Sequence, residues 1–189
     1  MIKVLKEVGY TEALLGLGLS YNLTNVNNIC DYQTSGRLHE VANKLADKGG
    51  GHNKFLESIN VYMYVKAPRY IWQEFDTYRV GITKQSESTM HTLMKSTIDN
   101  NMFDDIELEE NKEDFNIILQ AVERIKNRDN LHDTKVALPE GFIQGRLVVA
   151  NYKTIQNIYR QRKNHKMKWW RINLVDLLEQ LEHSELIIK

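Results

Sequence analysis

The strongest constraint on the fold is a strictly alternating segment that ends at a proline. In residues 59–66, INVYMYVK, every second side chain from Ile59 to Val65 is apolar. Because successive side chains of a strand point to opposite faces, this pattern predicts a half-buried strand. Pro68 follows and suits the first turn of a helix. One face of that helix carries the apolar residues Ile71, Phe75 and Tyr78. A strand that leads directly into a helix predicts mixed α and β structure.

Apolar residues with helical spacing mark several further segments. Ser35 can cap a helix that the glycines at 49–51 end, and residues 115–125 carry the pattern of a second helix. Residues 147–162 are expected to form a third helix, and Asn173 to cap a last one. No repeat or linker interrupts the sequence, so we predict one helix-rich α+β domain over the whole chain.

Two polar segments separate these elements. Residues 77–88 are polar and irregular, which predicts an exposed loop. Residues 104–114 are strongly acidic, and a solvated loop is the simplest interpretation of such a charge run.

Composition excludes several classes of protein. The chain has 189 residues, with 25 Lys and Arg against 25 Asp and Glu, which suits one domain and disfavours a basic nucleic-acid-binding surface. No apolar run approaches the roughly 18 residues needed to span a bilayer, and the N-terminal sequence MIKVLKEVGY is too polar for a signal peptide. Cys30 is the single cysteine, so no disulfide can form within the chain. We expect a cytoplasmic protein whose partners are neither membranes nor nucleic acids.

The common catalytic motifs are absent from the sequence. It has no Gly-rich phosphate loop with lysine, no Gly-x-Ser-x-Gly turn and no His-Glu-x-x-His helix. Its six histidines are scattered without the spacing of metal ligands, so no metal site is predicted.

The late segment 151–166, NYKTIQNIYRQRKNHK, is unusually rich in amides and cations. On a helix, Asn151 and Arg162 fall on the same side as the apolar Ile155 and Ile158. A plainly solvated helix would carry these polar groups on the opposite side, so the placement favours a binding face. The alternative is a cationic surface whose aliphatic stems pack against the protein. Periodicity alone leaves both interpretations open.

Two blocks of the sequence resemble one known family. In the segment His52–Arg79, HNKFLESINVYMYVKAPRYIWQEFDTYR, a histidine and a glutamate precede a strand that ends Lys-Ala-Pro, and a helix then leads to an arginine. This order resembles the flavin-dependent thymidylate synthases, which carry His-x-x-Pro-Phe-Glu-His, the Lys-Ala-Pro strand and Arg-His-Arg. The second block matches the spacing of that family's late helix without a gap, at Asn151, Asn157, Arg162 and Trp169.

The sequence departs from the family pattern where the chemistry is expected. Thr77 and Tyr78 stand in place of the first two residues of Arg-His-Arg. The loop at 80–91 needs one extra residue to align; it then keeps a serine at Ser88 but has Met-His where the family has Arg-Tyr. Two positive charges are therefore missing from an anion-binding site, and each charge-assisted hydrogen bond is worth about 1.5–3 kcal/mol.

The resemblance implies an α+β fold that is helix-rich with a central antiparallel sheet. It also implies a homotetramer in which several subunits build each active site. The residues that would hold FAD are His52, Arg79, Asn151 and Asn157. The residues that would hold the nucleotide are Ser88, Arg162 and Glu74, the last in place of a family glutamine.

Two of these residues have simpler interpretations. His52 would be an ordinary loop histidine between a helix and a strand, and Arg79 would form a surface ion pair with Asp76.

The resemblance leaves two functions open. The first is an enzyme that methylates C5 of a pyrimidine deoxynucleotide, of the dUMP-to-dTMP type, with FAD as cofactor and NADPH and methylenetetrahydrofolate as co-substrates. The second is a non-catalytic relative that binds a nucleotide for sequestration or regulation.

Overall fold

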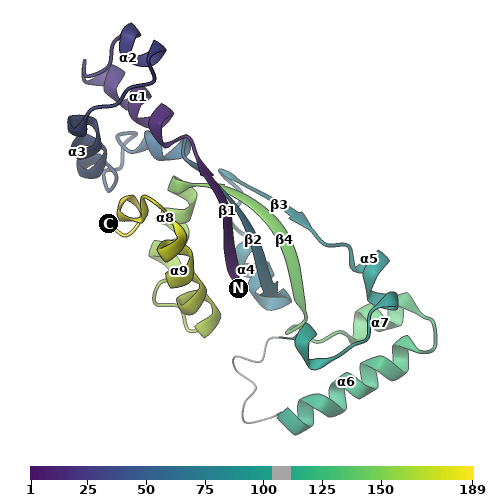
Figure 1. Ribbon diagram of the computed structural model, residues 1–189. Coiled ribbons are helices and arrows are strands. Elements are labelled where there is room, and N and C mark those ends of the chain that lie inside the picture. The colour runs from purple at the N-terminus through teal and green to yellow at the C-terminus, as the bar shows by residue number, and fades with distance from the viewer. Residues whose placement is uncertain (104–111) are drawn as a thin grey trace. The chain divides into compact units, whose positions relative to one another are not determined.

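A computed structural model describes residues 1–103 and 112–189. Its one named sheet has four strands in the order β1-β2-β4-β3 (Figure 1). The strands are β1 (Ile2–Val8), β2 (Asn60–Pro68), β3 (Ile82–Ser86) and β4 (Ile143–Asn151). Neighbouring strands run antiparallel, because the end of one is hydrogen-bonded to the start of the next: Lys66 N to Met1 O at 2.9 Å, Tyr152 N to Ile59 O at 2.9 Å and Asn151 N to Gly81 O at 2.9 Å.

Helices make up much of the described chain. The α-helices are α1 (Tyr10–Ser20), α2 (Val26–Cys30), α3 (Gly36–Leu45), α4 (Arg69–Phe75), α5 (Thr89–Thr92), α6 (Lys112–Lys126), α7 (Leu131–Ala137), α8 (Tyr152–Arg162) and α9 (Lys168–Gln180). Short 3-10 turns are η1 (Lys54–Glu57), η2 (Leu93–Lys95), η3 (Asn100–Met102) and η4 (Ser184–Leu186). No helix within the described residues is long and apolar enough to cross a membrane.

The chain divides into two compact units. Unit 1 comprises residues 1, 65–77 and 85–146, and unit 2 comprises residues 2–64, 78–84 and 147–189. The single domain expected over residues 1–189 stays a prediction.

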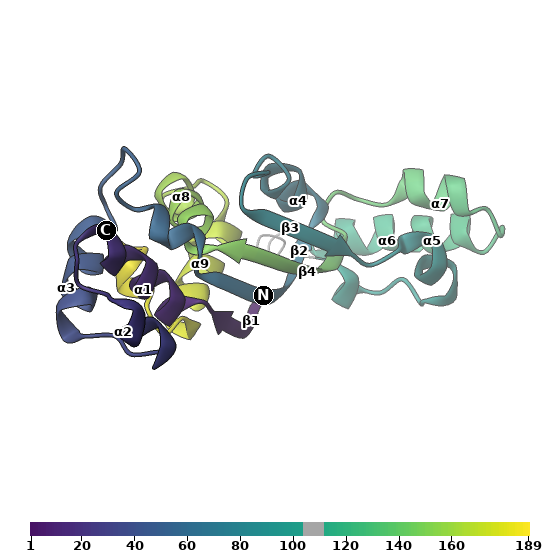
Figure 2. The same cartoon turned by 90° about the horizontal axis from the view of Figure 1, so that it is seen from above.

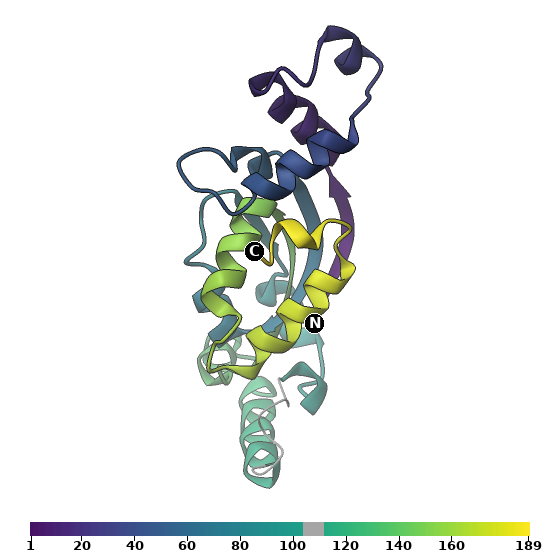
Figure 3. The same cartoon turned by 90° about the vertical axis from the view of Figure 1, so that its left-hand side faces the viewer.

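Unit 2 is built around two late helices. Helix α9 packs against β1 and α8, and α8 also packs against η1 (Figure 3). Helices α1 and α3 contact each other in the same unit. The largest fully buried side chains of this unit are Leu14, Leu38, Leu56, Ile59, Met63, Tyr152, Ile155, Trp170 and Leu186. The apolar side of α8, with Ile155 and Ile158, is therefore in the core.

Unit 1 has an apolar core of its own. Helices α6 and α7 pack against each other (Figure 2). The buried cluster consists of Leu93, Ile98, Phe103, Leu119, Val122, Leu138 and Phe142. In α4 the indole N–H of Trp72 donates to the carbonyl of Gln144 at 3.0 Å, which holds this helix against β4.

Several sequence predictions are confirmed. The alternating segment is strand β2, and its Val61, Met63 and Val65 are buried. The helix after Ser35 is α3, with Leu38 and Leu45 buried, although the Ser35 hydroxyl makes no capping hydrogen bond.

Other predictions are wrong in part. The polar segment 77–88 contains the strand β3, since an edge strand needs few apolar residues. Residues Leu147–Ala150 end the strand β4, because a short apolar run fits a buried strand as well as a helix. Asn173 lies inside α9, where its Nδ2 donates to the carbonyl of Trp169 at 2.8 Å.

One boundary also differs from expectation. Helix α3 ends at Leu45, before the glycines 49–51 that were expected to stop it. The acidic segment 104–114 lies mostly outside the described residues, so its interpretation as a solvated loop stays a prediction.

Candidate functional site

A tight turn in unit 2 joins the two blocks that resemble the family. The backbone N–H of Asn151 donates to the Gly81 carbonyl at 2.9 Å. Three residues later, the Thr154 hydroxyl donates to the Val80 carbonyl at 2.7 Å. The turn that follows Arg79 is thereby fixed to the first turn of α8.

Asn151 is the residue that shapes this junction. Its Oδ1 accepts a hydrogen bond from the Thr154 backbone N–H at 2.9 Å and so caps α8. Gly81 lies against it with φ of +66°, and a Cβ added there would be 2.4 Å from Asn151 Nδ2. Only glycine therefore fits at position 81 without movement of the cap.

Further along α8, the Tyr78 hydroxyl connects the same turn to the end of the helix. It donates to Gln161 Oε1 at 2.9 Å and accepts from Arg162 Nε at 3.0 Å. The side-chain amine of Lys84 donates to the Tyr78 carbonyl at 2.9 Å. Tyr78 is 7% exposed, so this hydroxyl lies at the edge of the core.

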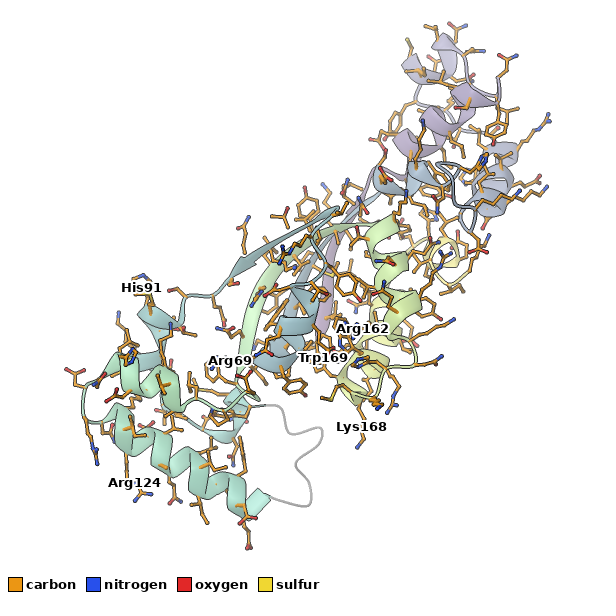
Figure 4. All side chains as sticks on the ribbon, turned by 180° about the vertical axis from the view of Figure 1, so that it is seen from behind. Arg69, His91, Arg124, Arg162, Lys168 and Trp169 are labelled. Atoms are coloured by element: carbon orange, nitrogen blue, oxygen red, sulfur yellow. The ribbon has the colours of Figure 1, made fainter. Side chains whose placement is uncertain are left out.

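Arg162 is half-buried and held on several sides. In addition to Tyr78, its Nη1 donates to His165 Nε2 at 2.8 Å, and its guanidinium lies 5.4 Å from the ring centroid of Trp170. Figure 4 shows Arg162 near Trp169, where the chain passes from α8 to α9. A guanidinium fixed by planar and hydrogen-bonding neighbours is suited to bind an anion.

The remaining candidates of this unit are exposed. Asn157 lies on α8, and its Oδ1 accepts from Gln161 Nε2 at 3.1 Å. Arg79 has no hydrogen bond or ion pair within residues 1–103 and 112–189. The alternative interpretation of Arg79, an ion pair with Asp76, is not found within the described residues, and Asp76 instead pairs with Arg146 at 2.8 Å.

His52 lies at a separate cavity of unit 2. This cavity measures about 650 Å³ and lies between α1 and residues 50–58, with Glu12, Gly51, Phe55 and Glu57 among its lining. Glu57 also forms an ion pair with Lys153 of α8 at 2.6 Å. The residues that line the cavity do not include Arg79, Asn157 or Arg162.

Glu74 and Ser88 belong to unit 1. Glu74 is half-buried near the end of α4, and its carbonyl accepts from the Thr77 hydroxyl at 2.7 Å. Ser88 is exposed at the start of α5, and its carbonyl accepts from the Thr92 hydroxyl at 3.0 Å. The structure thus joins Arg79, Asn151, Asn157 and Arg162 through one turn and one helix, and places Glu74 and Ser88 in the other unit.

Sequence reasoning missed three residues of this arrangement. The sequence places Tyr78 on the apolar face of a helix, which is wrong because α4 ends at Phe75, and it indicates no role for Gln161 or His165. One signal for Gln161 was present, because residues 157 and 161 are four apart and share a helix face. The contacts of Tyr78 with α8 span more than 80 positions and leave no local signal.

Comparison with known proteins identifies the fold. No protein-family model and no curated protein sequence matches the chain. A crystal structure of the flavin-dependent thymidylate synthase ThyX from Helicobacter pylori, complexed with FAD and dUMP, matches with a TM-score of 0.79 and 16% identity, over 99% of this chain and 97% of that chain. The chain has the fold of the flavin-dependent thymidylate synthases. A second ThyX structure from the same organism, with FAD and dUMP at 2.31 Å resolution, matches with a TM-score of 0.80 and 15% identity, over 99% and 96% of the two chains.

The helix-rich α+β fold with an antiparallel sheet is therefore confirmed as that of ThyX.

Proposed function

We propose that this protein binds FAD and a pyrimidine deoxynucleotide and methylates C5 of the nucleotide, in a reaction of the dUMP-to-dTMP type. A one-carbon unit from methylenetetrahydrofolate replaces the C5 hydrogen, and NADPH supplies the reducing electrons. The observation that carries the proposal is the contact of residues 78–81 with helix α8, because it joins the two blocks that resemble the family. The ThyX structures that share the fold hold FAD and dUMP.

The exposed residues of the site fit a flavin cofactor. The guanidinium of Arg79 is exposed and lacks a partner among the described residues, so it suits a cofactor phosphate. Asn157 offers an exposed amide on α8, and His52 lies at a cavity with room for part of a large ligand. Asn151 uses its side-chain oxygen for the helix cap, so its contribution is to hold the turn beside Arg79.

The protein supplies little acid–base chemistry in this proposal. When bound, FAD supplies the redox chemistry, and the protein has to bind and orient the reactants. Arg162 is proposed to bind the nucleotide phosphate, since its neighbours Tyr78 and His165 fix the direction of its guanidinium. Ser88 and Glu74 are proposed to contact the same nucleotide. We further propose a homotetramer, in which different subunits contribute such residues to one site.

A second function is favoured by two observations. Two nitrogens of Arg162 are already bonded to Tyr78 and His165 within the chain. Thr77 and Met90 also stand where the family pattern has arginines. These features favour a protein that binds a nucleotide for sequestration or regulation and no longer methylates it.

One experiment separates the two functions. Purified protein is incubated with FAD, NADPH, methylenetetrahydrofolate and dUMP, and dTMP is measured by mass spectrometry. The proposed enzyme forms dTMP only when FAD is present. It loses this activity in Arg162→Ala and keeps it in Arg160→Ala, since Arg160 lies on the same helix but pairs with Asp47. Binding of dUMP without any dTMP would instead support the second function, and binding of neither FAD nor dUMP would contradict both.

A further inference from the structure

A group of metal-ligating side chains lies in unit 2 apart from the site described above. It combines Glu7 at the end of β1 with Glu182 and His183 after α9. One donor atom from each residue lies within 4.8 Å of the other two. Four-coordinate Zn²⁺ has donors about 2.0–2.1 Å from the metal, so donors already this close need only small side-chain rotations to meet one ion.

Two buried polar atoms beside the group lack hydrogen-bond partners. Tyr152 is 0% exposed, and its hydroxyl oxygen has no partner among the residues that the structure describes. The same is true of Glu7 Oε1. The hydroxyl lies toward the Glu7 carboxylate and the His183 backbone. Buried polar groups without a partner are costly, and a cation bound to the Glu7 carboxylate would offset this cost for its oxygen.

Neighbouring residues hold the three donor side chains in place, and a cavity leaves them accessible to an ion. Glu7 Oε2 accepts the Glu182 backbone N–H at 3.0 Å, which ties the end of β1 to the turn after α9. The His183 ring stacks on Tyr10 with 3.4 Å between ring centroids, and its Nδ1 lies 3.8 Å from a Glu185 oxygen. A carboxylate beside a ligating histidine is a common second partner of zinc sites. A cavity of about 290 Å³ borders Glu7 and Glu182.

We propose that Glu7, Glu182 and His183 bind one divalent transition-metal ion of the zinc class, with the Tyr152 hydroxyl facing it. One imidazole and two carboxylates suit Zn²⁺ and its neighbours in the first transition row, whereas Mg²⁺ and Ca²⁺ prefer oxygen donors alone. Three protein ligands leave a fourth position for water. Because Glu7 and Glu182 are 175 positions apart, the ion would join the end of β1 to the C-terminal segment.

The test is a calorimetric titration of the tag-free full chain with Zn²⁺, after treatment with EDTA. We expect saturable binding of one Zn²⁺ per chain, and at least tenfold weaker binding in Glu7→Gln and in His183→Phe. Glu7→Gln keeps an oxygen that accepts from Glu182 N–H, and His183→Phe keeps a ring that stacks on Tyr10, so both variants preserve the local packing. His132→Phe is the matched control, since His132 is exposed on α7 outside the group.

Two further results are expected if the ion binds at this group. Mg²⁺ should not compete with Zn²⁺ at millimolar concentration, and Co²⁺ bound to the wild-type chain should give the intense visible bands of a low-coordinate site. A wild-type chain that binds no Zn²⁺, or that binds it no better than His183→Phe does, would overturn the proposal. A Co²⁺ spectrum identical to that of the aqueous ion would overturn it as well, without reliance on any variant.

Discussion

Arg79 and Arg162 have different surroundings although the same turn connects them. Arg162 is half-buried between Tyr78, His165 and Trp170, whereas Arg79 is exposed and has no partner among residues 1–103 and 112–189. An exposed cation without a partner contributes little to folding. In the proposed function, its partner is a phosphate of FAD.

Arg79→Ala is therefore expected to weaken binding of FAD while folding is preserved. The free energy of unfolding of the apoprotein should change by no more than about 0.5 kcal/mol, as for other surface substitutions. Flavin fluorescence titration and chemical denaturation measure the two quantities. A parallel loss of stability and of FAD affinity would mean that Arg79 is structural.

Tyr78→Phe, in contrast, is expected to lower the free energy of unfolding. It removes the hydroxyl that links Gln161 and Arg162 and leaves a half-buried arginine nitrogen without its acceptor, at a cost of about 1–2 kcal/mol. Tyr62→Phe serves as the control, because Tyr62 is exposed on β2. Equal unfolding free energies for the two variants in urea would show that the Tyr78 hydroxyl does not hold Arg162.

At the scale of elements, the junction between β3 and α8 depends on one glycine. Gly81 has φ of +66°, and any Cβ at this position would collide with the Asn151 cap. We expect Gly81→Ala to lower the unfolding free energy by about 1–3 kcal/mol, through backbone strain and loss of the cap. Gly16→Ala should raise it by about 0.5–1 kcal/mol, because Gly16 lies inside α1 and a Cβ there meets no atom within 4 Å. Differential scanning calorimetry of both variants measures these changes. A Gly81→Ala variant with an unchanged free energy of unfolding would contradict the close contact between Gly81 and Asn151.

The same junction shows which elements the sequence can predict. Strand β2 was predictable because it is buried on one face and therefore alternates. Strand β3 was not, because its polar residues form an edge whose pairing with β4 depends on residues about 60 positions away. The pattern at the end of strand β4 predicts the start of a helix, since its last apolar residues run directly into α8. The contact of Tyr78 with Arg162 joins residues far apart in the sequence, so no local pattern predicts it. Only the resemblance to the family predicts that Arg79 and Arg162 belong to one site.

At the scale of the whole molecule, the isolated chain exposes many apolar side chains. In unit 2 these include Leu5, Leu19, Tyr21, Val26, Ile29 and Tyr62. Their burial in an oligomer would be favourable. We predict a homotetramer at micromolar concentration, to be measured by multi-angle light scattering. A monomer would contradict the proposal that several subunits share one site.

The central claim is that this ThyX-like fold holds FAD beside helix α8. Its most direct test is equilibrium dialysis of the purified chain against FAD, with the bound flavin measured by its visible absorbance. We predict saturation at one FAD per chain, with weaker binding in Arg79→Ala and unchanged binding in Arg160→Ala. Equal FAD absorbance on the two sides of the dialysis membrane would contradict it.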